Sequence, residues 1–312
     1  MTGMRDLASM GRRARIGALQ RGAALVLVMW LIAALSLLAS GLASTARVDL
    51  RATQALKEFA VHAALGDAAI RLAASQLTVK PLDEGPASFA FDLGGRLLEV
   101  EVVPATGLIN LNHAPLELLR DLFQQAGELD EPQAQTLAER VIDWRDADED
   151  PMPDGAEEAA YVAAQSPFRP RNGAFESVDD LIQVLGMSLD LHDRIRRLVT
   201  TLGEGQGVDP RFASPAVLAV LASGNAATVT RILDARSAQD PLTDMTGLHQ
   251  PHLIQSASGP YRFSARYRSE HFELSRVRWI QLGGSGTGAP WVELSTEAVE
   301  SVALDAESVD GA

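Results

Sequence analysis

The first apolar stretch of the chain begins Gln20-Arg21-Gly22-Ala23-Ala24-Leu25-Val26-Leu27-Val28-Met29-Trp30 and continues without a charge through residues 23–46. As an α-helix, these 24 residues would be about 36 Å long, enough to cross a hydrocarbon core of roughly 30 Å. Five arginines and one acid precede the run, and a short basic flank stays on the cytoplasmic side. The sequence therefore predicts one membrane-spanning helix, with a short cytoplasmic N-terminus and the rest of the chain on the opposite side of the membrane.

A cleaved secretory signal is an alternative reading of the same stretch. The uncharged run is longer than a signal core of about 7 to 15 residues, and Ala39-Ser40-Gly41 is a weak cleavage site. We therefore expect the run to be retained.

The helical pattern continues beyond the apolar run. Small or apolar residues recur every three or four positions at Val48, Ala52, Ala55, Phe59, Ala63, Gly66, Ile70, Ala73 and Leu77. This spacing defines one helical face, and Pro81 ends the helix. We predict a transmembrane and stalk helix over residues 23–80. The periodicity alone fits a pilin-like spine and a plain anchor with a stalk equally well.

Two regions after this helix alternate as β-strands do. The first, residues 88–104, contains a turn at Gly94-Gly95 and reads as a hairpin. The second contains strands at residues 261–267, 272–282 and 291–294. We expect residues 81–105 and 259–296 to form one antiparallel sheet packed on the stalk helix, followed by an acidic tail over residues 297–312. The predicted class is α+β.

Residues 106–258 are expected to form an inserted all-α domain. Asn110 would cap a first helix, Pro132 opens a second, Ser177 with Asp180 forms a capping box, and Ser214-Pro215 starts a later helix. A further helix would carry Ile195, Leu198 and Val199. The pairs resemble helix-hairpin-helix units, which can bind a DNA phosphate through hairpin amides. Arg194, Arg196 and Arg197 follow the second hairpin, and we expect them to pair with local acids.

Residues 143–158 contain eight carboxylates and one arginine. Oxygen ligands in this number suit a hard cation such as calcium, whereas an acidic solvated loop is the alternative. Counted as an EF-hand loop from Asp146, the run has Pro151 where the turn needs Gly, so it is not an EF-hand. The candidate metal ligands are Asp146, Asp148, Asp150, Asp154, Glu157 and Glu158.

The composition excludes several kinds of function. With 41 acidic and 27 basic residues, the formal charge of −14 disfavours general binding to nucleic acid. The absence of cysteine excludes disulfides and thiol chemistry. Of six histidines only His249 and His252 are close in sequence, with no third zinc ligand in view. No nucleophile elbow or phosphate loop is present, so we predict no enzyme activity.

Three features together resemble known secretion proteins. The stretch ending in Gly22 resembles the leader of type IV pilins and type II secretion pseudopilins, in which prepilin peptidase cuts after the Gly and methylates the next residue, here Ala23. Family members usually carry Glu at the fifth mature position, which is Leu27 here. That departure is typical of the K type. The central region, with Asp-Trp-Arg-Asp-Ala-Asp from Asp143 and the Gly155-Ala-Glu-Glu run, resembles the K-type minor pseudopilins.

The resemblance implies a non-enzymatic subunit at the tip of a type II secretion pseudopilus, which supports protein export across the outer membrane. It further implies I-type and J-type minor pseudopilins as partners, processing between Gly22 and Ala23, and calcium in the acidic loop. No nucleic acid partner is expected. Two alternatives stay open at this point: a membrane-anchored helix-hairpin-helix DNA receptor of the competence type, and a minor pilin of a type IV pilus.

Overall fold

The computed structural model describes residues 10–82, 85–238, 244–255, 259–269, 272–283 and 289–303, with the side chains of residues 10–24, 39, 41–52 and 55 outside the description. The chain divides into two compact units, residues 1–62 and 63–312. Helix α1 (Met10–Val79) supplies the described part of the first unit and the beginning of the second. The predicted processing residues Gly22 and Ala23 fall within α1, but their side chains lie outside the description.

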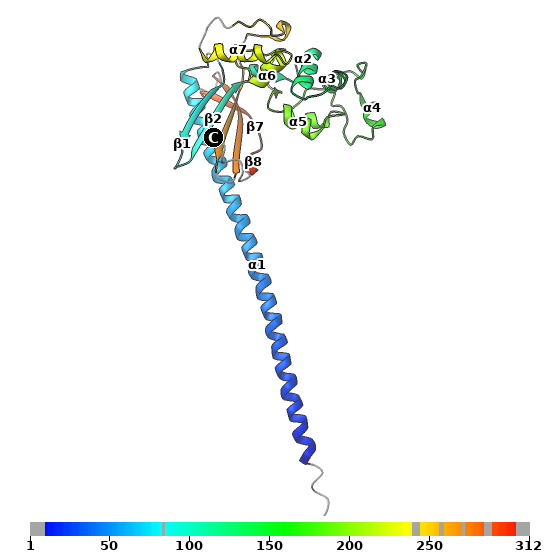
Figure 1. Ribbon diagram of the computed structural model, residues 1–312, viewed down its shortest axis with the longest axis vertical. Coiled ribbons are helices and arrows are strands. Elements are labelled where there is room, and N and C mark those ends of the chain that lie inside the picture. The colour runs from blue at the N-terminus through cyan, green and yellow to red at the C-terminus, as the bar shows by residue number, and fades with distance from the viewer. Residues whose placement is uncertain are drawn as a thin grey trace, which may run out of the picture. The chain divides into compact units, whose positions relative to one another are not determined.

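In the second unit, residues 63–79 of α1 lie along one face of an antiparallel sheet (Figure 1). Ala69, Ile70, Ala73, Ala74 and Leu77 are almost fully buried, at the spacing of one helical face. They pack against strand residues that include Val100, Phe263 and Ile280. The predicted packing of helix on sheet is therefore present, although Phe59, placed on the same face by the sequence pattern, is 41% exposed.

A charged contact joins the same part of α1 to the sheet. Asp67 accepts hydrogen bonds from Arg276 Nε at 2.8 Å and from Arg278 Nη2 at 2.8 Å. Burial opposes ionisation of Asp67, but the hydrogen bonds and charges of the two arginines outweigh it, so the pKa of Asp67 is lowered. The ion pairs therefore fix the helix to strand β6 (Phe272–Leu282) beside the apolar contact.

The sheet combines the two β regions that the sequence predicts. Its order is β1 (Ala87–Asp92), β2 (Leu97–Pro104), β5 (Tyr261–Arg268), β6 and β7 (Trp291–Thr296), all antiparallel. Gly94 and Gly95 have φ of +66° and +80° in the turn between β1 and β2, a conformation that favours glycine. Strand β8 (Glu300–Ala303) also pairs with β6, so the region assigned to an acidic tail contains a strand.

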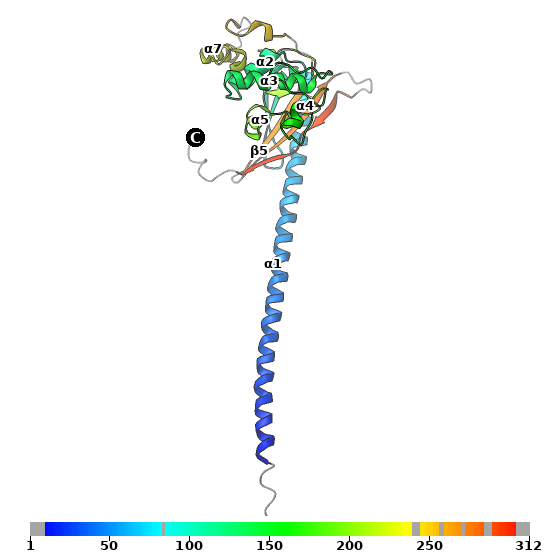
Figure 2. The same cartoon turned by 90° about the vertical axis from the view of Figure 1, so that its right-hand side faces the viewer.

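Between β2 and β5 lie mostly short helices, in this order: η1 (Ala105–Gly107), α2 (Leu116–Gln125), α3 (Glu131–Arg145), α4 (Glu158–Ala163), η2 (Val178–Gln183), α5 (Leu189–Ile195), α6 (Pro215–Leu221), α7 (Ala226–Ser237) and η3 (Gln250–His252). Polar side chains begin several of them: Asp130 accepts from the Gln133 amide and Ser214 from the Val217 amide. Helices α2 and α3 lie side by side (Figure 2).

The prediction that this insert is all-α is wrong. Strands β3 (Ile109–Asn110) and β4 (Val199–Thr200) pair in parallel, so Val199 is in a strand. Asn110 caps no helix, because its side-chain amide donates to the carbonyl groups of Leu202 and Gly203 instead. Ser177 begins η2, a 3₁₀-helix. The second predicted helix-hairpin-helix pair therefore consists of a 3₁₀-helix and the seven-residue α5, and the helix-hairpin-helix interpretation stays a prediction.

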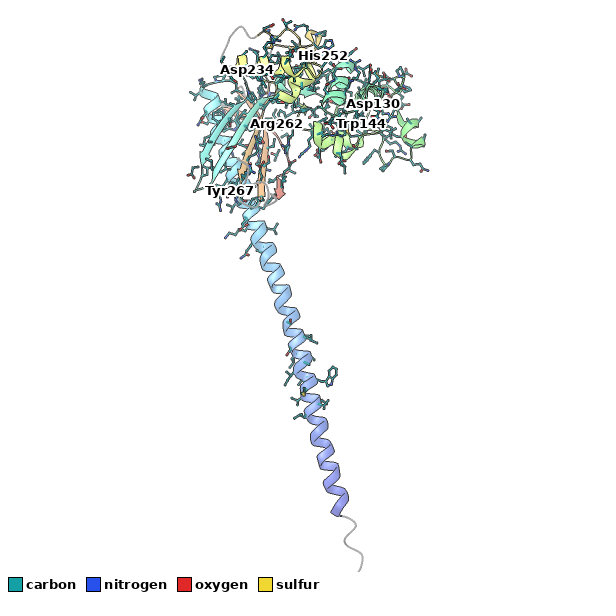
Figure 3. All side chains as sticks on the ribbon, in the orientation of Figure 1. Asp130, Trp144, Asp234, His252, Arg262 and Tyr267 are labelled. Carbon is teal, nitrogen blue, oxygen red and sulfur yellow. The ribbon has the colours of Figure 1, made fainter. Side chains whose placement is uncertain are left out.

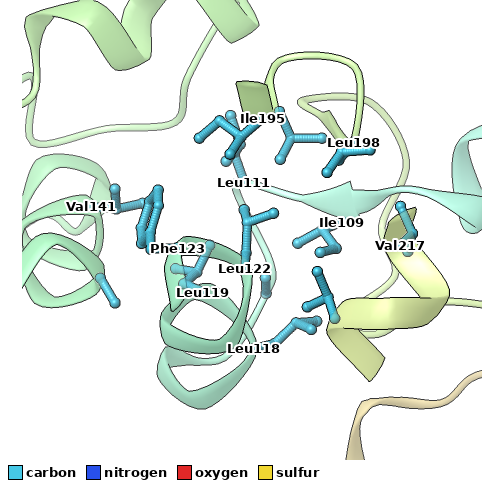
Figure 4. Packing of buried hydrophobic residues seen from close by; sticks show 14 of the residues in the cluster. Ile109, Leu111, Leu118, Leu119, Leu122, Phe123, Val141, Ile195, Leu198 and Val217 are labelled. Atoms are coloured by element: carbon cyan, nitrogen blue, oxygen red, sulfur yellow. The ribbon is translucent and has the colours of Figure 1, made fainter. Parts of the chain in front are cut away.

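The insert has its own hydrophobic core, separate from the core between α1 and the sheet. Leucines on one face of α2 meet Ile109 of β3, Val141 of α3 and Val217 of α6 (Figure 4). Because α2 contributes several fully buried side chains, it is the centre on which the other helices pack. This core positions the acidic loop, residues 146–157, which connects α3 to α4.

Candidate functional site: the acidic loop after helix α3

Two carboxylates of α3 hold the acidic loop by hydrogen bonds to its backbone. Asp143 is fully buried, and its Oδ2 accepts from the amide groups of Ala156 at 2.7 Å and Met152 at 3.2 Å. Glu139, four residues earlier on the same helical face, accepts from the Asp154 amide at 2.6 Å. The loop is therefore folded around acids that belong to the preceding helix.

Gly155 allows this close approach. A Cβ atom at this position would lie 1.9 Å from Asp143 Oδ2, well inside contact distance. Only glycine fits beside the carboxylate, so the Asp-Gly pair at residues 154–155 is a requirement of the loop geometry.

The residues next to Asp143 attach the end of α3 to the rest of the insert. Trp144, which is labelled in Figure 3, is buried. Its ring stacks on Phe175, with ring centroids 5.9 Å apart. Arg145 donates to the carbonyl groups of Leu111 and Ala114. The Asp-Trp-Arg sequence thus places one side chain in the loop, one in the core and one against the backbone before α2.

Several buried oxygens in the loop or beside it have no hydrogen-bond partner among the described residues. They are both carboxylate oxygens of Glu157, Oδ1 of Asp146 and Oδ1 of Asn172. Glu157 is only 6% exposed, and an unpaired carboxylate at that depth is costly. Asn172 also reaches the loop directly, because its Nδ2 donates to the Asp148 carbonyl at 3.2 Å. Oxygen atoms of this kind fit the ligand set of a hard cation.

The electrostatics of the loop show the same excess of negative charge. Burial, together with the charges of Asp143, Asp146 and Asp148, raises the pKa of Glu157 to about 7. Burial also raises the pKa of Asp146, with the charges of Asp148 and Asp143 adding to the effect. A bound divalent cation would reverse this balance by stabilising the ionised carboxylates.

The six predicted ligands divide into two groups. Asp146 and Glu157 have buried, unpartnered oxygens, whereas the other four are exposed, and Glu158 lies 3.7 Å from Arg169. Glu139 and Asn172 belong to the site but lie outside the acidic run predicted from the sequence, and Asp143 was counted in that run without being assigned as a ligand. For the two acids on α3 a signal existed, since residues four apart share a helical face. Among the described residues, no three acids of this loop bring ligand oxygens within 4.8 Å of one another.

The raised pKa of Glu157 predicts an unusual pH dependence. In a chelator, the free energy of unfolding should fall as pH rises from about 4.5 to about 7, because the folded state keeps a proton that the unfolded state has lost. The expected loss is about 3 kcal/mol for a shift of this size. Chemical denaturation at a series of pH values measures it.

Glu157→Gln should reduce this slope, because the raised pKa of Asp146 still contributes to it, whereas Glu158→Gln, at the exposed neighbouring position, should keep the full slope. Identical pH profiles for the wild type and Glu157→Gln would contradict the prediction.

The three arginines after the second predicted hairpin are paired with acids. Arg194 lies 2.9 Å from Glu128, Arg196 binds Glu300 of β8, and Arg197 lies 3.8 Å from Glu300. The predicted pairing with acids is present, but Glu128 and Glu300 are distant in the sequence, and among the described residues the one local pair is Arg196 with Asp193 at 3.4 Å. All three guanidinium groups are therefore paired with carboxylates.

In α1, Leu27 is 69% exposed, and the large apolar side chains around it are exposed as well. Within the described part of the chain, no helix combines the length and apolar character needed to cross a membrane. Residues 23, 24, 39 and 41–46 of the predicted span lie outside the described side chains.

Comparison with known proteins gives one consistent result. Residues 101–204 match the family model described as type II secretion system protein K. Type II secretion system protein K of Pseudomonas aeruginosa is 29% identical over 295 residues, which cover 85% of each chain. Its counterpart from Pectobacterium carotovorum is 33% identical over 88 residues, 28% of this chain and 26% of that one.

The fold has a counterpart in a solved structure. A chain of the crystal structure of the GspK-GspI-GspJ complex from the enterotoxigenic Escherichia coli type 2 secretion system aligns with a TM-score of 0.54. The alignment covers 80% of this chain and 99% of that chain at 18% sequence identity. The coarse α+β class predicted from the sequence, helices with an antiparallel sheet, is thereby confirmed.

Proposed function

We propose that this chain, a minor pseudopilin of the type II secretion system protein K family, forms the tip of a periplasmic pseudopilus. In that position it supports protein export across the outer membrane. The observation that carries the proposal is the insertion of residues 105–260 between two neighbouring strands of a helix-on-sheet unit. A subunit with so large an insert leaves little room for another subunit to be added above it in the pseudopilus. In this role it has no enzymatic activity.

The partners in this proposal are the I-type and J-type minor pseudopilins. A chain of the solved GspK-GspI-GspJ complex shares the fold of this chain. In this chain, exposed apolar residues of α1, among them Leu56, Phe59 and Leu72, offer a surface on which sister helices can pack. In pilin-like proteins, the Glu at the fifth mature position pairs with the terminal amine of a neighbouring subunit. A tip subunit has no such neighbour above it, which accounts for Leu27 at this position.

Co-purification of the full-length chain with the I-type and J-type subunits tests the assembly. We expect a stable complex that Leu27→Glu does not improve. Leu56→Asp should weaken it, whereas Thr53→Asp, at an exposed polar position one turn earlier, should weaken it less. A chain that stays alone but shifts oligonucleotides in a gel at low salt would favour the DNA-receptor alternative.

Membrane attachment and processing belong to the same proposal. The uncharged residues 23–46, preceded by arginines, would anchor the chain in the inner membrane after prepilin peptidase cuts between Gly22 and Ala23. Mass spectrometry of the mature N-terminus should find methylated Ala23. An N-terminus elsewhere would argue against a pseudopilin-type assembly.

We also propose that the acidic loop binds calcium. The unpartnered oxygens of Asp146 and Glu157 support this, with Asp148, Asp150, Asp154 and Glu158 supplying further carboxylates around them. The melting temperature should rise when calcium replaces chelator, and Glu157→Gln should lose most of the rise. Equal melting temperatures of the wild type in calcium and in chelator would exclude the site.

A further inference from the structure

A second cluster of metal-binding side chains lies in the insert, outside the acidic loop. Asp121 Oδ2 is 4.0 Å from His249 Nδ1 and 3.8 Å from His252 Nε2. One ligand atom from each of the three residues lies within 4.8 Å of the other two. His252 is labelled in Figure 3, apart from Trp144, which lies beside the acidic loop. The cluster brings a carboxylate of α2 to two imidazoles that follow it by more than a hundred positions in the sequence.

The backbone holds each member of this cluster in place. Asp121 sits on α2, and Arg120 donates to its Oδ1 at 3.1 Å, which leaves Oδ2 facing the histidines. The His249 amide donates to the Leu221 carbonyl, and the His252 carbonyl accepts from the Val208 amide. The three side chains therefore converge because separate elements are fixed against one another.

The buried member of the cluster lacks partners. His252 is only 2% exposed, and neither of its ring nitrogens has a hydrogen-bond partner within the described residues. A buried imidazole left unpaired is costly, so a native structure normally supplies a partner. Asp121 Oδ2 is too far away to be that partner, at 3.8 Å from Nε2.

We propose that Asp121, His249 and His252 bind a divalent transition metal ion, with Zn²⁺ as the best match. Zn²⁺ accepts imidazole nitrogen and carboxylate oxygen at about 2.0–2.1 Å in a tetrahedron, so its ligand atoms lie roughly 3.3 Å apart. The distances of 4.0 and 3.8 Å from Asp121 Oδ2 to the two imidazole nitrogens would have to shorten by about 0.5–0.7 Å, a change within the reach of side-chain rotation. Water fills the fourth position from the side of His249, whose side chain is 46% exposed.

The types of donor atom distinguish this site from the acidic loop. Imidazole nitrogens favour zinc and related transition metals, whereas calcium prefers a shell of oxygens. Burial, followed by the charge of His249, lowers the pKa of His252, against the opposing charges of Asp121 and Glu117. Burial therefore favours the neutral form of the imidazole, which is the form that binds a metal.

Zn²⁺ titration of the chelator-stripped full-length chain in excess calcium tests the site. We expect one Zn²⁺ per chain, a rise in melting temperature, and visible d–d absorption of a tetrahedral ion when Co²⁺ is used instead. Asp121→Asn and His249→Gln should each weaken Zn²⁺ binding at least about tenfold. His113→Gln, at an exposed histidine outside the cluster, is the matched control.

Two further comparisons make the result decisive. In chelator, His249→Gln should melt as the wild type does, which shows that its loss of binding is not a loss of fold. Glu157→Gln in the acidic loop should bind Zn²⁺ normally. Absence of Zn²⁺ uptake by the wild type, or equal binding by His249→Gln and His113→Gln, would overturn the proposal and leave an ordinary His-Asp contact.

Discussion

Replacing Asp143 with Ala is expected to lower the free energy of unfolding by roughly 2–5 kcal/mol. The substitution leaves the amide groups of Met152 and Ala156 without an acceptor, and each unpaired buried donor costs about 1–3 kcal/mol. Relief of repulsion with Glu139 and Asp148 offsets a part of this cost. Chemical denaturation in the presence of a chelator measures the loss.

Asp143→Asn separates the structural role of this carboxylate from its charge. An amide oxygen in the position of Oδ2 still accepts both backbone hydrogen bonds, so this variant should be nearly as stable as the wild type in chelator. In calcium, it should gain less than the wild type because the loop has lost one negative charge. If Asp143→Ala were as stable as Asp143→Asn in chelator, the loop would not depend on these hydrogen bonds.

Replacing Ile70 with Asp is expected to cost about 3–5 kcal/mol and to separate α1 from the sheet. Ile70 is 1% exposed in the core that Phe263 and Ile280 share with the helix, and a carboxylate there would be buried among apolar side chains. Leu72→Asp introduces the same charge two residues away, at a position that is 44% exposed, and should cost far less.

Thermal melting followed by tryptophan fluorescence and circular dichroism checks this pair. Trp279 and Trp291 belong to strands β6 and β7, whereas Trp144 lies in the insert. Because the two cores are separate, the Ile70→Asp variant should lose the sheet while the insert keeps its helices. Equal stabilities of the Ile70 and Leu72 variants would show that this helical face does not hold the sheet.

The parts of the fold with strong local periodicity were predictable from the sequence. The small residues of α1 recur every three or four positions up to Leu77, and the strands of the sheet show alternation with glycine at the turn between β1 and β2. The helix starts at Pro132 and Ser214 carried cap signals that the structure bears out. In these segments local preference and tertiary packing agree.

Elements set by distant contacts were not predictable in this way. Val199 looked helical because its neighbours are apolar, but it pairs with Ile109 of β3, ninety residues away. Ser177 carries a helix-start signal, yet the turn that follows is a 3₁₀-helix that ends at Gln183. In both places tertiary packing overrides the local pattern.

The candidate sites were predictable only where their members are neighbours in the sequence. The acidic run stood out by its composition, whereas Asn172 joins it only through the folded loop. The pair His249 and His252 lacked a third ligand because Asp121 lies on a helix near the start of the insert. Ligands supplied by separate elements leave no spacing in a single sequence.

The position of the insert has a consequence for the order of folding. Pro104 and Tyr261 face each other in register, although residues 105–260 lie between them. If those residues were still unfolded, joining the two strands would require closing a very long loop, and the chain entropy opposes that step. An insert that has already collapsed around α2 brings its own ends together. Destabilising substitutions in the core of the insert should therefore slow the formation of the sheet, even though the sequence of the strands is unchanged.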